Sequence, residues 1–185
     1  MAESSRAQKL ELITQRLRGF PDFPIKGILF RDICPILKDP KCTAAVTDLF
    51  EEYVRKKHPI VDLIVGLDAR GFLFGPLLAQ RLGVGFVLVR KKGKLPGPVK
   101  SLSYDLEYGK ADAEIQEDAI APGQKVLVID DLLATGGTLC AACELLKVQQ
   151  AVVLDCLVVV ELKDLSGAER LKPHTVFSLV SYDST

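Results

Sequence analysis

The sequence lacks the features on which several common classes of protein depend. Its 185 residues include no tryptophan, one methionine and two histidines, and 24 basic residues are balanced by 24 acidic ones. This balance argues against a chain that binds nucleic acid over its whole surface. No apolar run approaches the roughly 18 residues of a membrane-spanning helix, and the first residues lack the apolar core of a secretory signal. We therefore expect a cytoplasmic protein that binds neither nucleic acid nor a membrane.

Familiar catalytic and redox motifs are also missing. The chain has no G-x-G-x-x-G, G-x-x-x-x-G-K-[ST] or G-x-S-x-G, so dinucleotide, Walker-type and α/β-hydrolase sites have no basis in the sequence. Five cysteines without regular spacing make no disulfide framework. Cys140 and Cys143 match C-x-x-C but follow a turn instead of opening a helix, so we interpret them as small helix residues. Because His58 and His174 lack metal-ligand spacing and are expected at the surface, acid–base chemistry falls to a carboxylate.

The most informative segment is residues 126–138, an apolar run that ends in two acids and a turn of small residues. A helix is predicted directly after it, over residues 139–149. The unpaired N–H groups of a helix start suit a phosphate, glycines allow close approach of the backbone and threonines add hydroxyl donors. Asp130 and Asp131 would repel phosphate, so vicinal hydroxyls or a metal suit them better. A phosphorylated sugar with a free diol meets both demands. The residues of this phosphate turn are Ala134, Thr135, Gly136, Gly137 and Thr138.

Strand-like and helix-like segments alternate along the chain, which predicts a single α/β domain over residues 1–185 with a mostly parallel sheet flanked by helices. Residues 20–27 are typical of turns. Residues 28–30 form a short extended run that either lines a pocket or covers the core, and the pattern alone favours covering. Residues 55–58 are interpreted as the solvated, basic end of a helix. Further helices are expected over residues 4–18, 39–57, 72–82 and 165–171, and further strands over residues 61–67, 84–89, 151–162 and 176–182.

Two further segments bear on a site. Residues 90–98, the basic loop, leave the C-terminal end of a predicted strand, where α/β sheets bind their ligands. A solvated charge run is one reading of this loop, but its position favours a site for a polyanion. Residues 101–116 alternate weakly in hydropathy and predict a polar, mobile hairpin with Gly109 near its tip. Such a hairpin could close over an active site as a lid.

Residues 126–138 resemble the phosphoribosyl-pyrophosphate motif of the type I phosphoribosyltransferases. Other segments narrow the resemblance to the adenine phosphoribosyltransferases, above all those of animals: residues 20–24, 27–32, 66–72, 90–97 and 106–110. The resemblance implies the type I phosphoribosyltransferase fold, with a base-binding hood at about residues 1–35 and a flexible lid at about residues 92–118. It also implies transfer of the 5-phosphoribosyl group from phosphoribosyl pyrophosphate to adenine, giving AMP and pyrophosphate, with Mg²⁺ held mainly by the substrate and with a homodimer as the active form.

The resemblance also assigns roles to the reacting end of the site. The phosphate turn holds the ribose 5-phosphate, and Asp130 and Asp131 face the ribose hydroxyls. Their charge suits a centre that becomes positive as the bond to pyrophosphate breaks. Glu107 handles a proton on a purine nitrogen, and Tyr108 helps to close the lid. Without the resemblance, Glu107 would be interpreted as a solvated acid.

The base and the leaving group receive residues in the same way. Main-chain groups of Leu29 and Arg31 are expected to read adenine while the ring of Phe30 stacks on it, which replaces the covering role. Residues 68–71 resemble the loop that binds pyrophosphate in the family, and the resemblance implies a cis peptide bond between the first two of them. The family often has Ser where this chain has Ala69, so no side-chain role is assigned there. The residues expected at the pyrophosphate are Asp68, Ala69, Arg70, Arg90 and Lys94.

Two alternatives stay open. One is a binding or regulatory protein that kept the phosphoribosyltransferase fold and lost its activity. Glu107 and the base-binding segment argue against it. The other is a phosphoribosyltransferase for another base, such as orotate, hypoxanthine or uracil. Those enzymes share residues 126–138 but not residues 27–32 as they stand here.

Overall fold

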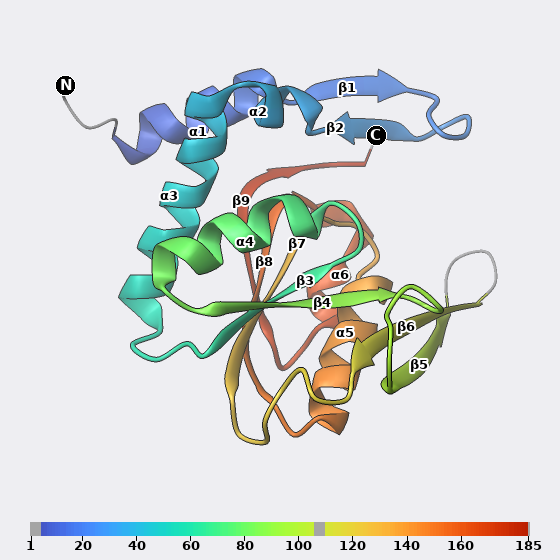
Figure 1. Cartoon of the computed structure of the whole chain (residues 1–185). Coiled ribbons are helices and arrows are strands. Elements are labelled where there is room, and N and C mark those ends of the chain that lie inside the picture. Colours follow the sequence, from blue (N-terminus) through green and yellow to red (C-terminus); the bar gives the residue numbers. More distant parts are fainter. Residues whose placement is uncertain (1–4, 106–109, 185) are drawn as a thin grey trace.

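The computed structural model describes residues 5–105 and 110–184 and is built around a seven-stranded sheet in the order β5-β6-β4-β3-β7-β8-β9 (Figure 1). The five strands from β4 to β9 in this order are parallel, and β5 and β6 form an antiparallel hairpin that pairs with β4 at Arg90 and Lys91. The prediction of a mostly parallel α/β sheet is therefore confirmed. The strands are β3 (Leu63–Leu67), β4 (Gly85–Lys91), β5 (Val99–Asp105), β6 (Lys110–Gln116), β7 (Lys125–Leu133), β8 (Val152–Leu162) and β9 (Thr175–Tyr182).

The helices begin and end where the sequence supplies caps. In α3 the Asp39 carboxylate accepts hydrogen bonds from the backbone N–H groups of Lys41 and Cys42 at 3.0 and 3.4 Å, as an N-cap residue does. Gly83 ends α4 in the left-handed conformation, with φ 70°. None of the helices within the described ranges is long and apolar enough to cross a membrane. The helices are α1 (Arg6–Arg16), α2 (Cys34–Lys38), α3 (Pro40–Lys57), α4 (Gly71–Leu82), α5 (Gly137–Val148) and α6 (Gly167–Arg170), with a 3₁₀ turn at Lys163–Leu165.

Two groups of buried side chains, one on each face of the sheet, form the core. The strand β7 contributes to both, because successive side chains of a strand point to opposite faces. Leu127 and Ile129 pack with α1, α3 and α4, whereas Val126 and Val128 pack with α5. This arrangement fixes β7 between two helical layers and holds its carboxyl end at the centre of the sheet.

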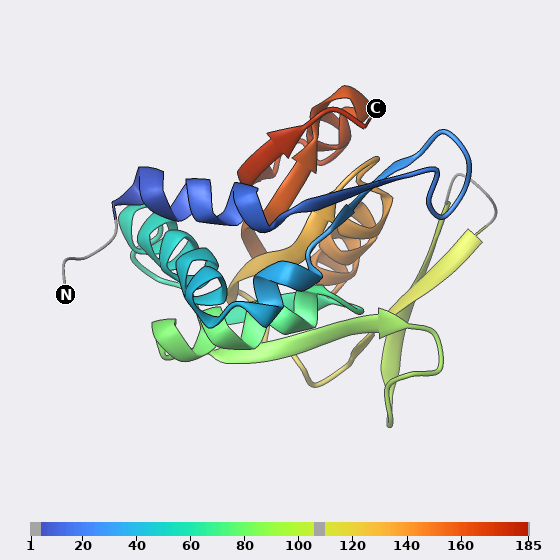
Figure 2. The same cartoon turned by 90° about the horizontal axis from the view of Figure 1, so that it is seen from above.

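A second, two-stranded sheet lies apart from the main one. Strands β1 (Arg18–Pro21) and β2 (Leu29–Asp32) pair antiparallel, with Phe20 opposite Phe30, and we call them the hood hairpin. Figure 1 shows the hood hairpin above the main sheet with the end of β9 beneath it, and Figure 2 shows it from above. The sequence predicted β2 but assigned the end of β1 to a turn. Its ladder depends on a partner ten residues away and on the ion pair between Arg18 and Asp32.

Two of the differences from the predicted boundaries have a clear physical cause. Strand β7 does not end at the two acids but continues to Leu133, because it keeps pairing with β8 as far as Glu161. The segment that was predicted as one short helix is broken into a 3₁₀ turn and the four-residue α6, since Ser166 between them adopts the left-handed conformation with φ 54°.

The end of α3 is only partly a solvated charge run. Arg55, Lys56 and Lys57 are exposed as predicted, but His58 is not a surface residue, and both Lys57 and His58 contact a buried acid. Asp155 on β8 is 1% exposed. Its carboxylate accepts hydrogen bonds from Tyr53 Oη at 2.7 Å and Lys57 Nζ at 2.9 Å, and lies 2.6 Å from His58 Nε2. Burial opposes the charged form of Asp155, but the bonds from His58, Tyr53 and Lys57 outweigh it and lower the pKa of the carboxyl. We call these four residues the Asp155 cluster.

Candidate active site

A cavity of about 790 Å³ opens at the carboxyl ends of β3, β4 and β7. Strands β4, β5 and β6 lie on one side of β3, and the later strands β7, β8 and β9 lie on its other side. The cavity therefore lies where the winding of the sheet reverses, which is the usual ligand position in such folds. The structure brings eleven of the predicted site residues to its wall. They are Asp68, Ala69, Arg70, Arg90, Asp130, Asp131, Ala134, Thr135, Gly136, Gly137 and Thr138.

The phosphate turn presents backbone donors to this cavity. Gly136 has φ 83° and precedes α5, and no side chain caps the helix start. The first N–H groups of a helix have no partner within it, and the first intrahelical bond here is donated by Cys140 N to Gly136 O. Gly167 of α6 packs so closely on the turn that an added Cβ would lie 2.2 Å from Ala134 O. The turn is therefore a fixed, uncapped set of N–H donors that suits a phosphate.

The two acids lie beside the turn and are held differently. Asp131 is 4% exposed, and its Oδ2 lies 2.6 Å from Arg70 Nε. Asp130 accepts a hydrogen bond from Asp131 N at 2.8 Å. Burial, and next the charge of Asp131, raise the pKa of the Asp130 carboxyl well above its ordinary value. The site thus contains one acid paired with a cation and one acid that resists ionisation.

The turn after β3 approaches the acids because of a glycine. Gly71 begins α4 at a point where an added Cβ would lie 2.6 Å from Ile129 O and 3.3 Å from the Asp130 Cα. A side chain there would push the turn away from β7. The peptide bond between Asp68 and Ala69 is cis, as the resemblance implies. Arg70 follows directly, which is how its guanidinium reaches Asp131.

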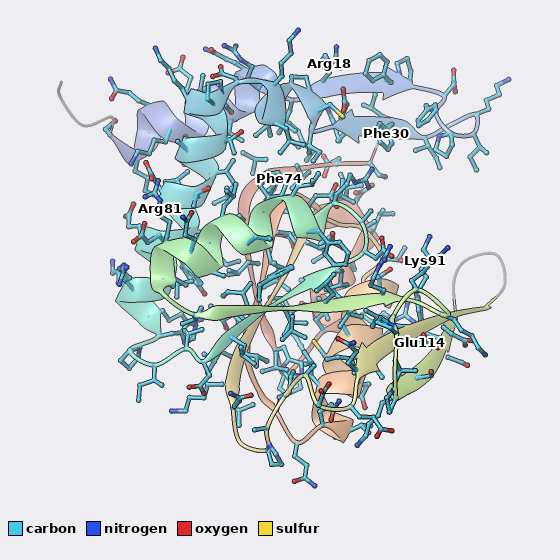
Figure 3. The ribbon with its side chains drawn as sticks, in the orientation of Figure 1. Arg18, Phe30, Phe74, Arg81, Lys91 and Glu114 are labelled. Atoms are coloured by element: carbon cyan, nitrogen blue, oxygen red, sulfur yellow. The ribbon has the colours of Figure 1, made fainter. Side chains whose placement is uncertain are left out.

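The basic loop is fastened to the neighbouring strands. Arg90 Nε lies 3.0 Å from Asp68 Oδ2, and Arg90 Nη1 donates to Lys94 O at 3.4 Å. Glu114 on β6 is 4% exposed, and its carboxylate accepts from Gly93 N at 2.9 Å and Ser101 Oγ at 3.0 Å. Figure 3 shows Lys91 and Glu114 where the hairpin β5–β6 meets β4. The main chain of Lys94 is placed by these contacts, but Lys94 is not among the residues lining the cavity.

The predicted base-binding residues lie on the hood hairpin, outside the cavity lining. The Phe30 ring has Phe23 edge-on at 5.0 Å between centroids, and the Arg70 guanidinium lies 5.8 Å from its centroid. Phe30 is labelled on the hood hairpin in Figure 3. Arg70 therefore contacts both the acid strand and the aromatic ring proposed to stack on the base.

Some site residues were not predicted, and some predictions cannot be placed. Arg170 of α6 and Tyr104 of β5 line the cavity. Arg170 comes from a segment far from every motif, so only the packing of Gly167 on the phosphate turn could have indicated it. Glu107 and Tyr108 lie outside the described residues. Across residues 5–105 and 110–184, no group of three His, Cys, Asp or Glu side chains could hold a metal ion.

The chain matches known proteins over most of its length. Residues 35–183 match the family model of the phosphoribosyl transferase domain. The chain is 59% identical to the adenine phosphoribosyltransferase of Mastomys natalensis over 95% of this chain and 98% of that one.

Two solved structures share the fold. An adenine phosphoribosyltransferase from Saccharomyces cerevisiae, complexed with an imino-altritol bisphosphate and adenine, superposes with a TM-score of 0.91 at 43% identity, covering 94% of this chain and 99% of that one. The enzyme from Giardia lamblia, complexed with 9-deazaadenine, gives 0.86 at 37% identity over 97% and 99%.

Proposed function

The chain belongs to the phosphoribosyl transferase family, and we propose that it transfers the 5-phosphoribosyl group from phosphoribosyl pyrophosphate to adenine, giving AMP and pyrophosphate. This is a purine salvage reaction. The observation that carries the proposal is the cavity itself, which joins an uncapped helix start, two acids and a cationic turn at one edge of the sheet.

The phosphate turn binds the 5-phosphate of the substrate. Its backbone N–H groups and the hydroxyls of Thr135 and Thr138 donate hydrogen bonds to the phosphate oxygens. This contact is the same in phosphoribosyl pyrophosphate and in AMP, so it fixes the ribose while the bond at C1 is exchanged. With the sugar fixed, the base can attack one face of C1 while pyrophosphate leaves from the opposite face.

The two acids bind the ribose hydroxyls and stabilise the transition state. When the C1–oxygen bond breaks ahead of bond formation, positive charge develops on the ring. Carboxylates already held near that charge need no reorganisation, which is a large source of catalysis. Asp131 is pre-oriented by Arg70. Burial and Asp131 raise the pKa of Asp130, and a positive charge developing nearby would lower it and so favour the carboxylate.

The leaving pyrophosphate is bound by Arg70, Arg90, Lys94 and the main chain at Asp68 and Ala69. We propose that Mg²⁺, which would be held mainly by the substrate, would supply charge neutralisation to the leaving group. The residues near it supply cations that fit such a polyanion, and Arg70 and Arg90 are both oriented by carboxylates.

The hood supplies the base site. Main-chain groups of Leu29 and Arg31 are proposed to bind the edge of adenine, and the Phe30 ring stacks on its face. Glu107 is proposed to take the proton that the nucleophilic purine nitrogen loses, or to move this proton to another ring nitrogen. Tyr108 is proposed to help close the lid. The hood, about residues 1–35, and the lid, about residues 92–118, are thus the parts proposed to choose and enclose the base.

We further propose a cytoplasmic homodimer. All five cysteines are free, which is usual in a reducing compartment. Leu73 and Leu77 lie one turn apart on α4 and are 44% and 36% exposed, so they offer apolar surface to a second copy. Sedimentation equilibrium on the purified chain tests the dimer, and a monomer at micromolar concentration would contradict it.

The reaction is tested by turnover with a panel of bases. The purified protein receives phosphoribosyl pyrophosphate, Mg²⁺ and one of adenine, hypoxanthine, guanine, orotate or uracil, and both pyrophosphate and nucleotide are measured. We expect adenine to react at least about a hundredfold faster than the others, because a site built on hydrogen bonds rejects bases that leave its groups unpaired. Chelation of Mg²⁺ should abolish turnover. Comparable rates with another base would refute adenine specificity, and no turnover with any base would favour a binding protein.

A further inference from the structure

The base-recognition segment is carried by a hairpin that is weakly packed at its tip. Phe23 and Ile25 at the tip are 53% and 52% exposed, whereas Ile33 at the root of the hairpin is 2% exposed. Leu29, Phe30 and Arg31 lie between these ends and are only partly buried. The orientation of this segment above the cavity therefore depends on specific contacts near its middle, not on a core of its own.

Arg31 makes the contact that reaches the main sheet. Its guanidinium carbon lies 4.2 Å from the centroid of the Tyr182 ring, and its Nη2 lies 3.5 Å from Asp183 O. On the hairpin itself the guanidinium passes over Gly19, where an added Cβ would lie 3.6 Å from Arg31 Nη1. Arg31 is thus held between Gly19 of β1 and the aromatic ring at the end of β9.

The Tyr182 ring offsets part of the energetic cost of burying the Arg31 guanidinium. Within the described part of the chain, the buried Nε of Arg31 has no hydrogen-bond partner, and an unpaired buried donor is costly. A guanidinium over an aromatic face recovers part of that cost, the more so where water is excluded. Loss of the ring would remove the reason for Arg31 to remain at this place.

Tyr182 is in turn a fixed platform. On one side it pairs with Leu162 in the β8–β9 ladder. Two residues further on, Ser184 N donates to Asp164 Oδ1 at 2.9 Å, and the Ser184 hydroxyl bonds to the same carboxylate. Tyr182 also packs against the part of the core that lies on the α3 and α4 face of the sheet. Figure 1 shows this last stretch of β9 running beneath the hood hairpin.

We propose that Tyr182 is a positioning residue for the base. Through Arg31, it sets the angle of the hood hairpin and so the place of the main-chain groups and the Phe30 ring that bind adenine. Tyr182 is not among the residues that line the cavity, so we expect its main effect on the base. The proposal rests on the proposed function of the hood, and it makes the last strand of the fold part of the adenine site.

The test separates the two substrates. In Tyr182→Leu, which keeps apolar bulk but has no aromatic face, the KM for adenine should rise about three- to thirtyfold. The KM for phosphoribosyl pyrophosphate and kcat at saturation should change less than about twofold. Tyr182→Phe keeps the ring and should behave as the unmodified protein. Arg31→Met keeps the main chain, should raise the adenine KM by a similar factor, and should add nothing in the Tyr182→Leu background.

Several results would overturn the proposal. These are an unchanged adenine KM in Tyr182→Leu, an equal rise in both KM values, or additive effects of the two substitutions. Each presumes that the unmodified protein makes AMP, so they leave the proposed function standing. If it makes no AMP, the proposed function fails instead, and hydrogen exchange still tests the contact. Amides of residues 18–32 should then exchange faster in Tyr182→Leu but not in Tyr182→Phe, and equal exchange refutes the proposal.

Discussion

Arg70 Nε lies 2.6 Å from Asp131 Oδ2, so the turn after β3 and the acid strand β7 are joined by an ion pair at the centre of the cavity. The Asp131 side chain is 5% exposed, whereas that of Arg70 is 46% exposed. Most of the solvent-exposed surface of this ion pair therefore belongs to the cation. Arg70 can share its charge between the buried carboxylate and a pyrophosphate without leaving either.

Arg70→Gln should weaken both the fold and the substrate site. The buried Asp131 would lose its cation, and we expect the free energy of unfolding to fall by about 1–2 kcal/mol, less than for a fully buried pair because Arg70 faces solvent. The kcat/KM for phosphoribosyl pyrophosphate should fall at least about tenfold. Urea unfolding and steady-state kinetics measure the two effects. Arg81→Gln, which breaks surface pairs with Asp48 and Glu51, is the control and should change stability by less than about 1 kcal/mol.

Arg170→Gln should raise the KM for phosphoribosyl pyrophosphate about three- to tenfold, because Arg170 lines the same cavity as the phosphate turn and is a cation to which no role has been assigned. The AMP Kd, measured by titration calorimetry, should rise by a similar factor while that of adenosine does not. Lys172→Gln removes the same charge two residues away, from a side chain that pairs with Glu169 at the surface. Equal effects of the two substitutions would show that Arg170 acts only through its long-range charge and does not contact the 5-phosphate.

Glu107→Gln should lower kcat by roughly 10²–10⁴-fold if this residue moves the purine proton. The substitution keeps the shape of the side chain and removes its basicity. Single-turnover measurement of AMP formation reports the chemical step directly. Glu117→Gln, an exposed acid on the same stretch of chain, should be silent. A Glu107→Gln protein with full single-turnover activity would remove Glu107 from the mechanism.

Asp130→Asn should stabilise the protein while it lowers activity. The pKa of Asp130 is raised by burial and by Asp131, so its ionisation disfavours the folded state as the pH rises from the unfolded pKa of about 3.9 through the higher folded pKa. Removing the charge should therefore raise Tm by roughly 2–4 °C at pH 8 and by less near pH 4. Calorimetry across this range checks the sign. A lower Tm at pH 8 would show that the carboxylate is favoured in the fold.

Asp155→Asn should destabilise the protein without touching the cavity, which lies at the other end of the strands. Breaking the Asp155 cluster should cost about 2–4 kcal/mol near neutral pH. The folded pKa of Asp155 is lowered, so its contribution is present above the unfolded pKa of about 3.9 and is lost as the pH falls through the folded value. The two proteins should therefore converge in stability only once the pH has fallen below the lowered folded pKa. Asp118→Asn, an exposed site, is the control, and a constant difference at all pH values would contradict this account.

The mostly parallel α/β class of the main sheet and the identity of its central motif could be predicted because both depend on local sequence. Apolar runs between turn residues marked β3, β7 and β8, and the small residues after Asp131 marked the start of α5. The Asp155 cluster could not be predicted, since Asp155 meets Tyr53 and His58 only after about a hundred residues of chain have folded. Arg170 was not connected with the phosphate turn because its segment comes about thirty residues later in the chain, and β1 was missed because its four residues pair, among the residues that the structure describes, only with β2. The contacts that hold the hood are likewise long-range, and they run through a residue at the end of the last strand.

The fixed spacing of the three neighbouring strands β4, β3 and β7 also sets the distances between the site residues that they carry. Adjacent strands lie about 4.8 Å apart, so Arg90 near the end of β4, Asp68 directly after β3 and Asp130 on β7 mark off roughly 10 Å across the sheet. In the proposed reaction, pyrophosphate lies toward Arg90 and Asp68 and the ribose diol lies toward Asp130, so the donor is laid across the three strands. Backbone ladders between buried strands cannot slip by a fraction of a residue, so substitutions in the loops can change which base is accepted but cannot change the length of the donor.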